Sequence, residues 1–148
     1  MFNSETDSKS FFVIGVHHRG TDKVIEWSLV EYEKTYQVIK QVMKSYYPKQ
    51  KKIKIFVATD DQEFLTYLKS IHPSCVIYNN FVRSSNGVPL HYGENNLYAN
   101  SYQKGREAVI DCLILSRCHT LIRPATSCFS LIFTFFNPAL PVIALMPN

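Results

Sequence analysis

The sequence contains little glycine, and the glycine-rich motifs that bind phosphate are absent. Only 5 of its 148 residues are glycine, and neither Gly-x-Gly-x-x-Gly nor Gly-x-x-x-x-Gly-Lys-Ser/Thr occurs. Those motifs place glycine where the backbone turns sharply or must approach a phosphate closely. Their absence argues against the common dinucleotide-binding site and against a P-loop.

The sequence also lacks the cysteine pairs of zinc sites and disulfide frameworks. No Cys-x-x-Cys occurs, and we expect free, buried thiols in a reducing compartment. The histidines match no known zinc spacing, and the adjacent His17 and His18 would point to opposite sides of a strand. We therefore expect no metal. The four cysteines are Cys75, Cys112, Cys118 and Cys128.

Signals for export, for a membrane span and for nucleic-acid binding are missing too. Residues 1–10 are polar and carry Glu5 and Asp7, which predicts a flexible N-terminal segment before a domain at 11–148, in a cytoplasmic protein. The longest apolar run, Phe129–Met146, is interrupted by prolines, so we expect no membrane span. The net charge of +4 with one short basic run, 49–54, disfavours nucleic acid but suits an anionic small ligand such as a nucleotide diphosphate.

The chain length indicates one domain. A chain of 148 residues, 46% hydrophobic and 19% charged, is long enough to build a core without disulfides or a structural metal. An enzyme that holds two large substrates usually does so in a cleft between two domains. We expect half of such a cleft to be absent from this chain.

Strand and helix patterns alternate along the sequence. A Ser-x-x-Glu capping box at Ser28 precedes the first helix pattern, and Asp60-Asp61 can cap the second. The alternation predicts an α/β domain with a mostly parallel sheet of about five strands flanked by helices. The predicted strands are 11–17, 53–59, 75–78, 120–122 and 141–145, and the predicted helices are 29–47, 62–71, 107–118 and 127–136.

A polar segment, 79–103, separates the third strand from the third helix. A loop of this length inside a compact domain is more often functional or mobile than filler. Its aromatic residues Phe81, Tyr92 and Tyr98 either line a pocket or anchor the loop.

Polar residues gather where the predicted strands end, which is where ligands bind in parallel sheets. Arg19 follows the first strand, and its guanidinium offers a planar fork of donors for a diphosphate, with Asp22 placed to hold that fork or the turn. A surface turn with a structural Arg–Asp pair explains the same residues. Thr126 and Ser127 open the last helix with hydroxyls and backbone N–H groups that suit an anion.

Four segments together resemble a known family. Their order and spacing are similar to the nucleotide-sugar-binding half of the α-1,6-fucosyltransferases and their rhizobial Nod-factor relatives, a superfamily that includes the protein O-fucosyltransferases. The likeness runs over residues 11–145 and implies a Rossmann-like fold, a GDP-fucose or related GDP-sugar donor, a glycan or glycoconjugate acceptor, and no cofactor. The four segments are Ile14–Lys23, Val57–Asp61, Gly105–Ser116 and Thr126–Ser130.

The resemblance also implies roles for single residues. His17 would lie beside the guanine nucleotide, Arg19 would neutralise the β-phosphate as it leaves, and Asp111 would accept hydrogen bonds from the guanine edge. Ser127 would lie near the β-phosphate. The other substrate-binding residues implied are Asp22, Asp60, Asp61, Arg106 and Thr126.

The implied reaction is an inverting transfer that needs no metal. Arg19 and the helix start at Ser127 would stabilise the charge that develops on the diphosphate. A general base must take the proton of the acceptor hydroxyl, and Glu26 is the candidate, with an ordinary loop glutamate as the alternative.

The chain departs from the family pattern in two ways. Gly20 stands where the α-1,6 enzymes carry a second arginine, and the family's preceding, acceptor-binding half is not in the chain. We expect a dimer or a separate domain to complete the cleft. Two alternatives stay open: a non-catalytic nucleotide-binding or protein-interaction module, and an unrelated α/β domain that uses its polar loop for protein contacts.

Overall fold

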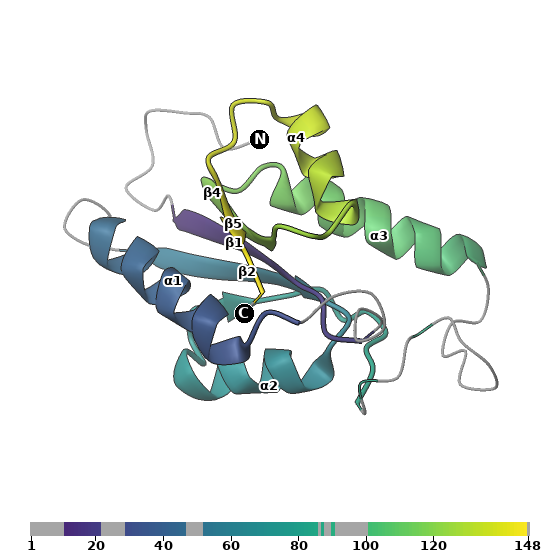
Figure 1. Cartoon of the computed structure of the whole chain (residues 1–148), viewed down its shortest axis with the longest axis horizontal. Helices are drawn as coiled ribbons and strands as arrows, with labels where there is room; N and C mark the ends of the chain where they lie inside the picture. The colour runs from purple at the N-terminus through teal and green to yellow at the C-terminus, as the bar shows by residue number, and fades with distance from the viewer. Residues whose placement is uncertain are drawn as a thin grey trace.

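The computed structural model describes residues 11–21, 29–46, 52–85, 87, 90 and 101–147. Within these residues five parallel strands form one sheet in the order β3-β2-β1-β4-β5 (Figure 1). This is the α/β, Rossmann-like arrangement that the sequence predicts. The strands are β1 Phe12–His18, β2 Ile53–Thr59, β3 Val76–Ile77, β4 Thr120–Pro124 and β5 Val142–Leu145.

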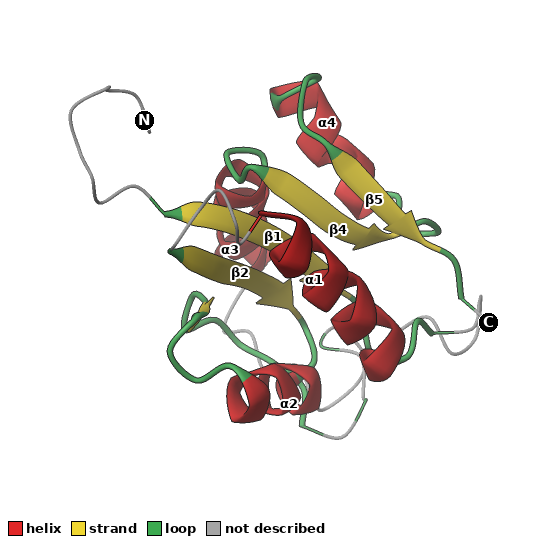
Figure 2. Ribbon diagram, turned by 90° about the vertical axis from the view of Figure 1, so that its left-hand side faces the viewer, coloured by secondary structure: helices red, strands yellow, loops and turns green. Residues whose placement is uncertain are grey.

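Helices cover both faces of this sheet. Helices α1 and α2 lie on one side and α3 and α4 on the other (Figure 1). In Figure 2, α1 lies in front of the sheet and α3 behind it. None of the described helices is long and apolar enough to cross a membrane. The helices are α1 Tyr32–Tyr46, α2 Gln62–Ile71, α3 Ser101–Leu115, the short 3-10 turn η2 Phe129–Leu131 and α4 Ile132–Phe136.

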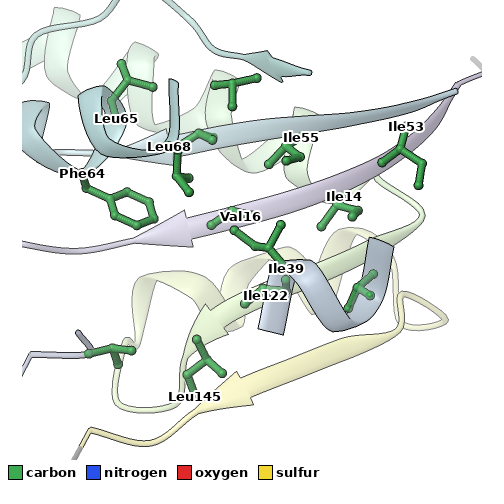
Figure 3. Packing of buried hydrophobic residues seen from close by; sticks show 14 of the residues in the cluster. Ile14, Val16, Ile39, Ile53, Ile55, Phe64, Leu65, Leu68, Ile122 and Leu145 are labelled. Carbon is green, nitrogen blue, oxygen red and sulfur yellow. The ribbon is translucent and has the colours of Figure 1, made fainter. Parts of the chain in front are cut away.

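The core has two layers, one on each face of the sheet. Because side chains alternate along a strand, Ile14 and Ile55 point toward α1 and α2, where they pack with Ile39 and Phe64 (Figure 3). Phe56 of β2 lies in the opposite layer, with residues of α3 and α4. The central strands are therefore buried on both faces, as their near-continuous apolar sequences predict.

Some predicted boundaries agree with the structure and others are wrong. Strand β2 and helix α2 match their predicted ranges, and Asp61 caps α2 by accepting hydrogen bonds from the backbone N–H groups of Glu63 and Phe64. Helix α1 begins only at Tyr32, and its first turn is closed by the Thr35 backbone N–H, which donates to the carbonyl of Glu31. The capping-box residue Ser28 and the N-terminal segment 1–10 lie outside the described residues.

The third helix differs most from its prediction. It spans Ser101–Leu115, so it starts earlier and ends earlier than predicted, and Val109 on its outer side is 54% exposed. A helix that packs on a sheet buries one side only, here through Glu107, Cys112 and Leu115.

The cysteines are free, as predicted, but two of them are not fully buried. Cys112 and Cys118 are buried, and burial raises the pKa of Cys112 to about 11 and that of Cys118 to about 12. Cys75 is half-buried, and Cys128 is exposed because it sits on the turn before η2.

Candidate functional site

One cavity of about 210 Å³ lies at the carboxyl ends of β1 and β2, on the side of the sheet that α3 covers. It is bounded by β1, β2, the segment after β3, α3 and η2. The chain adds β2 and β3 on one side of β1 and then β4 and β5 on its other side. Ligands of parallel α/β sheets bind at the point where the strand order changes direction in this way. The lining residues are His17, Arg19, Thr21, Ala58, Thr59, Asp60, Phe81, Val82, Leu90, Lys104, Glu107, Ala108, Asp111 and Phe129.

The two histidines of β1 point to opposite faces, as predicted. The His17 ring lies on the cavity side, with its centroid 5.5 Å from that of Phe129. The His18 ring stacks on Phe64 at 3.8 Å in the other layer, where burial lowers its pKa from 6.5 to about 4. The described residues hold no group of three side chains that could bind a metal ion.

Asp60 fixes the segment that carries Arg19. Its carboxylate accepts one hydrogen bond from the backbone N–H of Gly20 at 2.9 Å and another from the Thr21 hydroxyl at 2.5 Å. The end of β2 is thereby joined to the loop that follows β1. Arg19 is half-buried in the cavity wall, and the two residues that follow it are held by this connection.

Asp61, the next residue, faces the other layer. It is buried, caps α2 and accepts a hydrogen bond from the Tyr32 hydroxyl. Burial, together with that hydrogen bond, raises the pKa of the Tyr32 phenol. A Cβ atom on Gly20 would lie 2.3 Å from Oδ2 of Asp61, so Asp61 fills the space that a side chain at position 20 would need.

Asp111 contributes a carboxylate from α3. Its Oδ1 accepts a hydrogen bond from Nδ2 of Asn79 at 2.7 Å. Burial raises the pKa of Asp111 to about 6, although the Asn79 hydrogen bond and the nearby Arg83 act in the opposite direction. Asp111 is thus a partly desolvated acceptor facing the cavity, poised to ionise within the range of cellular pH.

The cavity brings together four of the ten predicted site residues. His17, Arg19, Asp60 and Asp111 line it, and so does Phe81 from the polar segment. The predicted residues Asp22 and Glu26, and the loop aromatics Tyr92 and Tyr98, lie outside the described residues.

Four predicted residues are described but do not line the cavity: Asp61, Arg106, Thr126 and Ser127. Arg106 is exposed on α3. Ser127 is buried, and the helical turn after it begins at Phe129 with Cys128 as a cap that makes no side-chain hydrogen bond. The last helix is only a 3-10 turn followed by five residues of α4, so it lacks the regular first turn that the anion-site prediction assumed.

Two charged residues of the cavity wall were missed by the sequence analysis. Lys104 and Glu107 lie three residues apart, and Asp111 follows four residues later, so that all three share one face of α3. This spacing is visible in the sequence, but the prediction began the helix at Glu107 and so left Lys104 outside it.

Three solved structures resemble this chain. The NodZ alpha-1,6-fucosyltransferase co-crystallised with GDP matches at 25% identity and a TM-score of 0.55, and the same enzyme soaked with GDP-fucose at 26% and 0.55. The fucosyltransferase NodZ from Bradyrhizobium matches at 26% and 0.54. No family model and no curated protein matches the sequence.

Each of these matches covers 93% of this chain and 39% of the solved chain. The chain therefore has the fold of one part of a NodZ fucosyltransferase and spans about two fifths of its length. The resemblance that the sequence motifs suggested is confirmed at the level of the fold.

Proposed function

We propose that this chain binds GDP-fucose or a related GDP-sugar and forms the donor-binding part of a fucosyltransferase-like glycosyltransferase. One observation carries the proposal: Asp111, far along the sequence from His17 and Arg19, lies with them in the wall of one cavity at the carboxyl edge of the sheet. The fucosyltransferase resemblance implies contacts with the nucleotide for all three. The structural similarity to NodZ structures prepared with GDP and with GDP-fucose supports it.

The chemistry of the cavity suits the two ends of GDP. Guanine carries N1–H and 2-amino donors, and Asp111 offers a carboxylate acceptor with one oxygen already held by Asn79. Arg19 offers parallel N–H donors to the diphosphate. As the bond to the sugar breaks, negative charge grows on the leaving diphosphate, and Arg19 stabilises it without a metal ion.

The proposed transfer inverts the anomeric carbon. The acceptor hydroxyl attacks from the face opposite the diphosphate while a base removes its proton, and Glu26 is our candidate for that base. We propose that the acceptor binds opposite this cavity, on a separate domain or a second copy of this chain.

Titration calorimetry with GDP and GDP-fucose tests the proposal. We expect both to bind, and Arg19→Ala to weaken GDP binding by about tenfold or more because a charge-assisted contact is lost. Arg117→Ala, which removes an exposed arginine beyond the end of α3, is the matched control and should bind GDP as the wild type does. No binding at millimolar nucleotide, or full affinity in Arg19→Ala, would refute the proposal.

A nucleotide-binding module without turnover is the second candidate, favoured by Gly20, which stands where the α-1,6 enzymes carry a second arginine and whose side-chain space Asp61 fills. Release of GDP from GDP-fucose in the presence of glycan acceptors separates the two. Release that depends on the acceptor identifies a transferase, whereas binding without release identifies a module. An unrelated protein-interaction domain would show no change in melting temperature with either nucleotide.

A further inference from the structure

A second carboxylate, that of Glu107, lies in the cavity wall one helical turn before Asp111. Glu107 is 9% exposed, and its Oε1 accepts a hydrogen bond from Nε2 of Gln103 at 3.0 Å. Its Oε2 is buried and has no hydrogen-bond partner among the described residues. Leaving a buried carboxylate oxygen unpaired is costly, so this atom suits a donor supplied by a ligand.

Glu107 and Asp111 form a matched pair of acceptors. Residues four apart on a helix have Cβ atoms about 5–6 Å from each other on one face. Each has one oxygen held by a side-chain amide, Gln103 for Glu107 and Asn79 for Asp111. The second oxygen of Glu107 is unpartnered in the described structure, so the wall favours a flat ligand edge with neighbouring N–H donors.

Among the nucleobases, guanine has such an edge. It carries an N1–H donor and, beside it, a 2-amino group with two further hydrogens, whereas adenine presents an acceptor at N1. Hypoxanthine keeps the N1–H donor but lacks the 2-amino group. A base that differs by this one group therefore tests what Glu107 contacts.

We propose that Glu107 is a specificity-determining residue that accepts a hydrogen bond from the 2-amino group of guanine, beside Asp111 at the same base edge. This inference rests on the proposed function, because it names a further contact of the same nucleotide.

Calorimetry with GDP and with inosine diphosphate (IDP) measures the contact directly. We expect the wild-type protein to bind GDP about tenfold or more tightly than IDP, the effect of one charge-assisted hydrogen bond. Glu107→Ala should bring the ratio of the two affinities close to one while IDP affinity changes little. Glu107→Gln preserves the size of the side chain and a carbonyl acceptor, so it should give an intermediate ratio. This variant tests the same contact if the alanine variant does not fold.

Glu63→Gln makes the same chemical change at an exposed position of α2 and should leave the ratio as in the wild type. Equal affinity of the wild type for GDP and IDP, or an unchanged ratio in Glu107→Ala, would overturn the assignment while the nucleotide site stands. The assignment would also be overturned if Glu107→Ala lowered the preference for GDP over 2′-deoxy-GDP and left the preference for GDP over IDP unchanged. Glu107 would then contact the ribose. Absence of all nucleotide binding by the wild type would instead refute the proposed function.

Discussion

Replacing Gly20 with alanine tests the contact between the loop after β1 and the start of α2. The φ angle of Gly20 lies outside the left-handed region, so the backbone itself accepts alanine. The obstacle is Asp61, whose Oδ2, Cβ and Cγ would lie 2.3, 2.7 and 2.8 Å from the new methyl group. Because such distances are well inside van der Waals contact, the Asp61 side chain must move.

The cost follows from what Asp61 loses when it moves. Its cap on α2 is worth about 1 kcal/mol and its hydrogen bond from Tyr32 about 2 kcal/mol. We therefore expect Gly20→Ala to lower the free energy of unfolding, measured by urea denaturation, by about 3 kcal/mol. In an Asp61→Gly background, which removes the clashing atoms, the same change should cost less than about 1 kcal/mol.

Gly105→Ala is the control for this experiment. A Cβ atom at Gly105 would meet nothing within 4 Å, and alanine is the better helix former, so this variant should be more stable by about 0.5–1 kcal/mol. The reasoning is refuted if Gly20→Ala is as stable as the wild type. It is also refuted if the cost of the substitution is the same with and without Asp61.

Two further predictions concern pH. The affinity for GDP-fucose should fall as the pH drops below about 6, where Asp111 takes up a proton, and Asp111→Asn should remove this dependence; GDP-fucose is the right probe because the terminal phosphate of GDP itself titrates near pH 6. His18 has a folded-state pKa of about 4 against an ordinary 6.5, so the unfolded chain binds its proton more strongly between these values. The contribution of His18 to the free energy of unfolding is present in full above pH 6.5. It falls by about 3 kcal/mol as the pH drops from 6.5 through 4. His18→Phe should flatten the dependence of unfolding free energy on pH in that window, and an unchanged slope would contradict the assignment.

The elements that the sequence predicts best are those with strong local signals. Strand β2 is a buried apolar run that ends in a polar residue, and Asp61 provides the start signal of α2. Helix α3 begins earlier than predicted because the prediction rested on the apolar pattern that starts after Arg106, and the residues of its first turn, 101–104, lie outside that pattern.

The site was predictable in part for the same reason. His17 and Arg19 were predicted because they stand at a strand end and in a family motif, and Asp111 was predicted because it falls on a motif of the same family; all three line the cavity. Asp60 faces the cavity and Asp61 faces the opposite core layer. The sequence pattern does not show which of the two lies on the cavity side of the sheet. Glu107 was missed because the prediction began the helix at this residue, so the preceding turn, which carries its hydrogen-bond partner Gln103, was not part of the predicted helix.

Asp60 and Asp61 hold two different parts of the structure, and this has a consequence for ligand binding. Asp60 ties down the loop that carries Arg19, and Asp61, one peptide bond away, is anchored to α2 and to Tyr32 in the opposite core layer. The backbone that carries Arg19 is therefore fixed before a ligand binds, and only the Arg19 side chain has to be ordered. Backbone that is already fixed costs no further conformational entropy when an anion binds, so more of each contact appears as affinity.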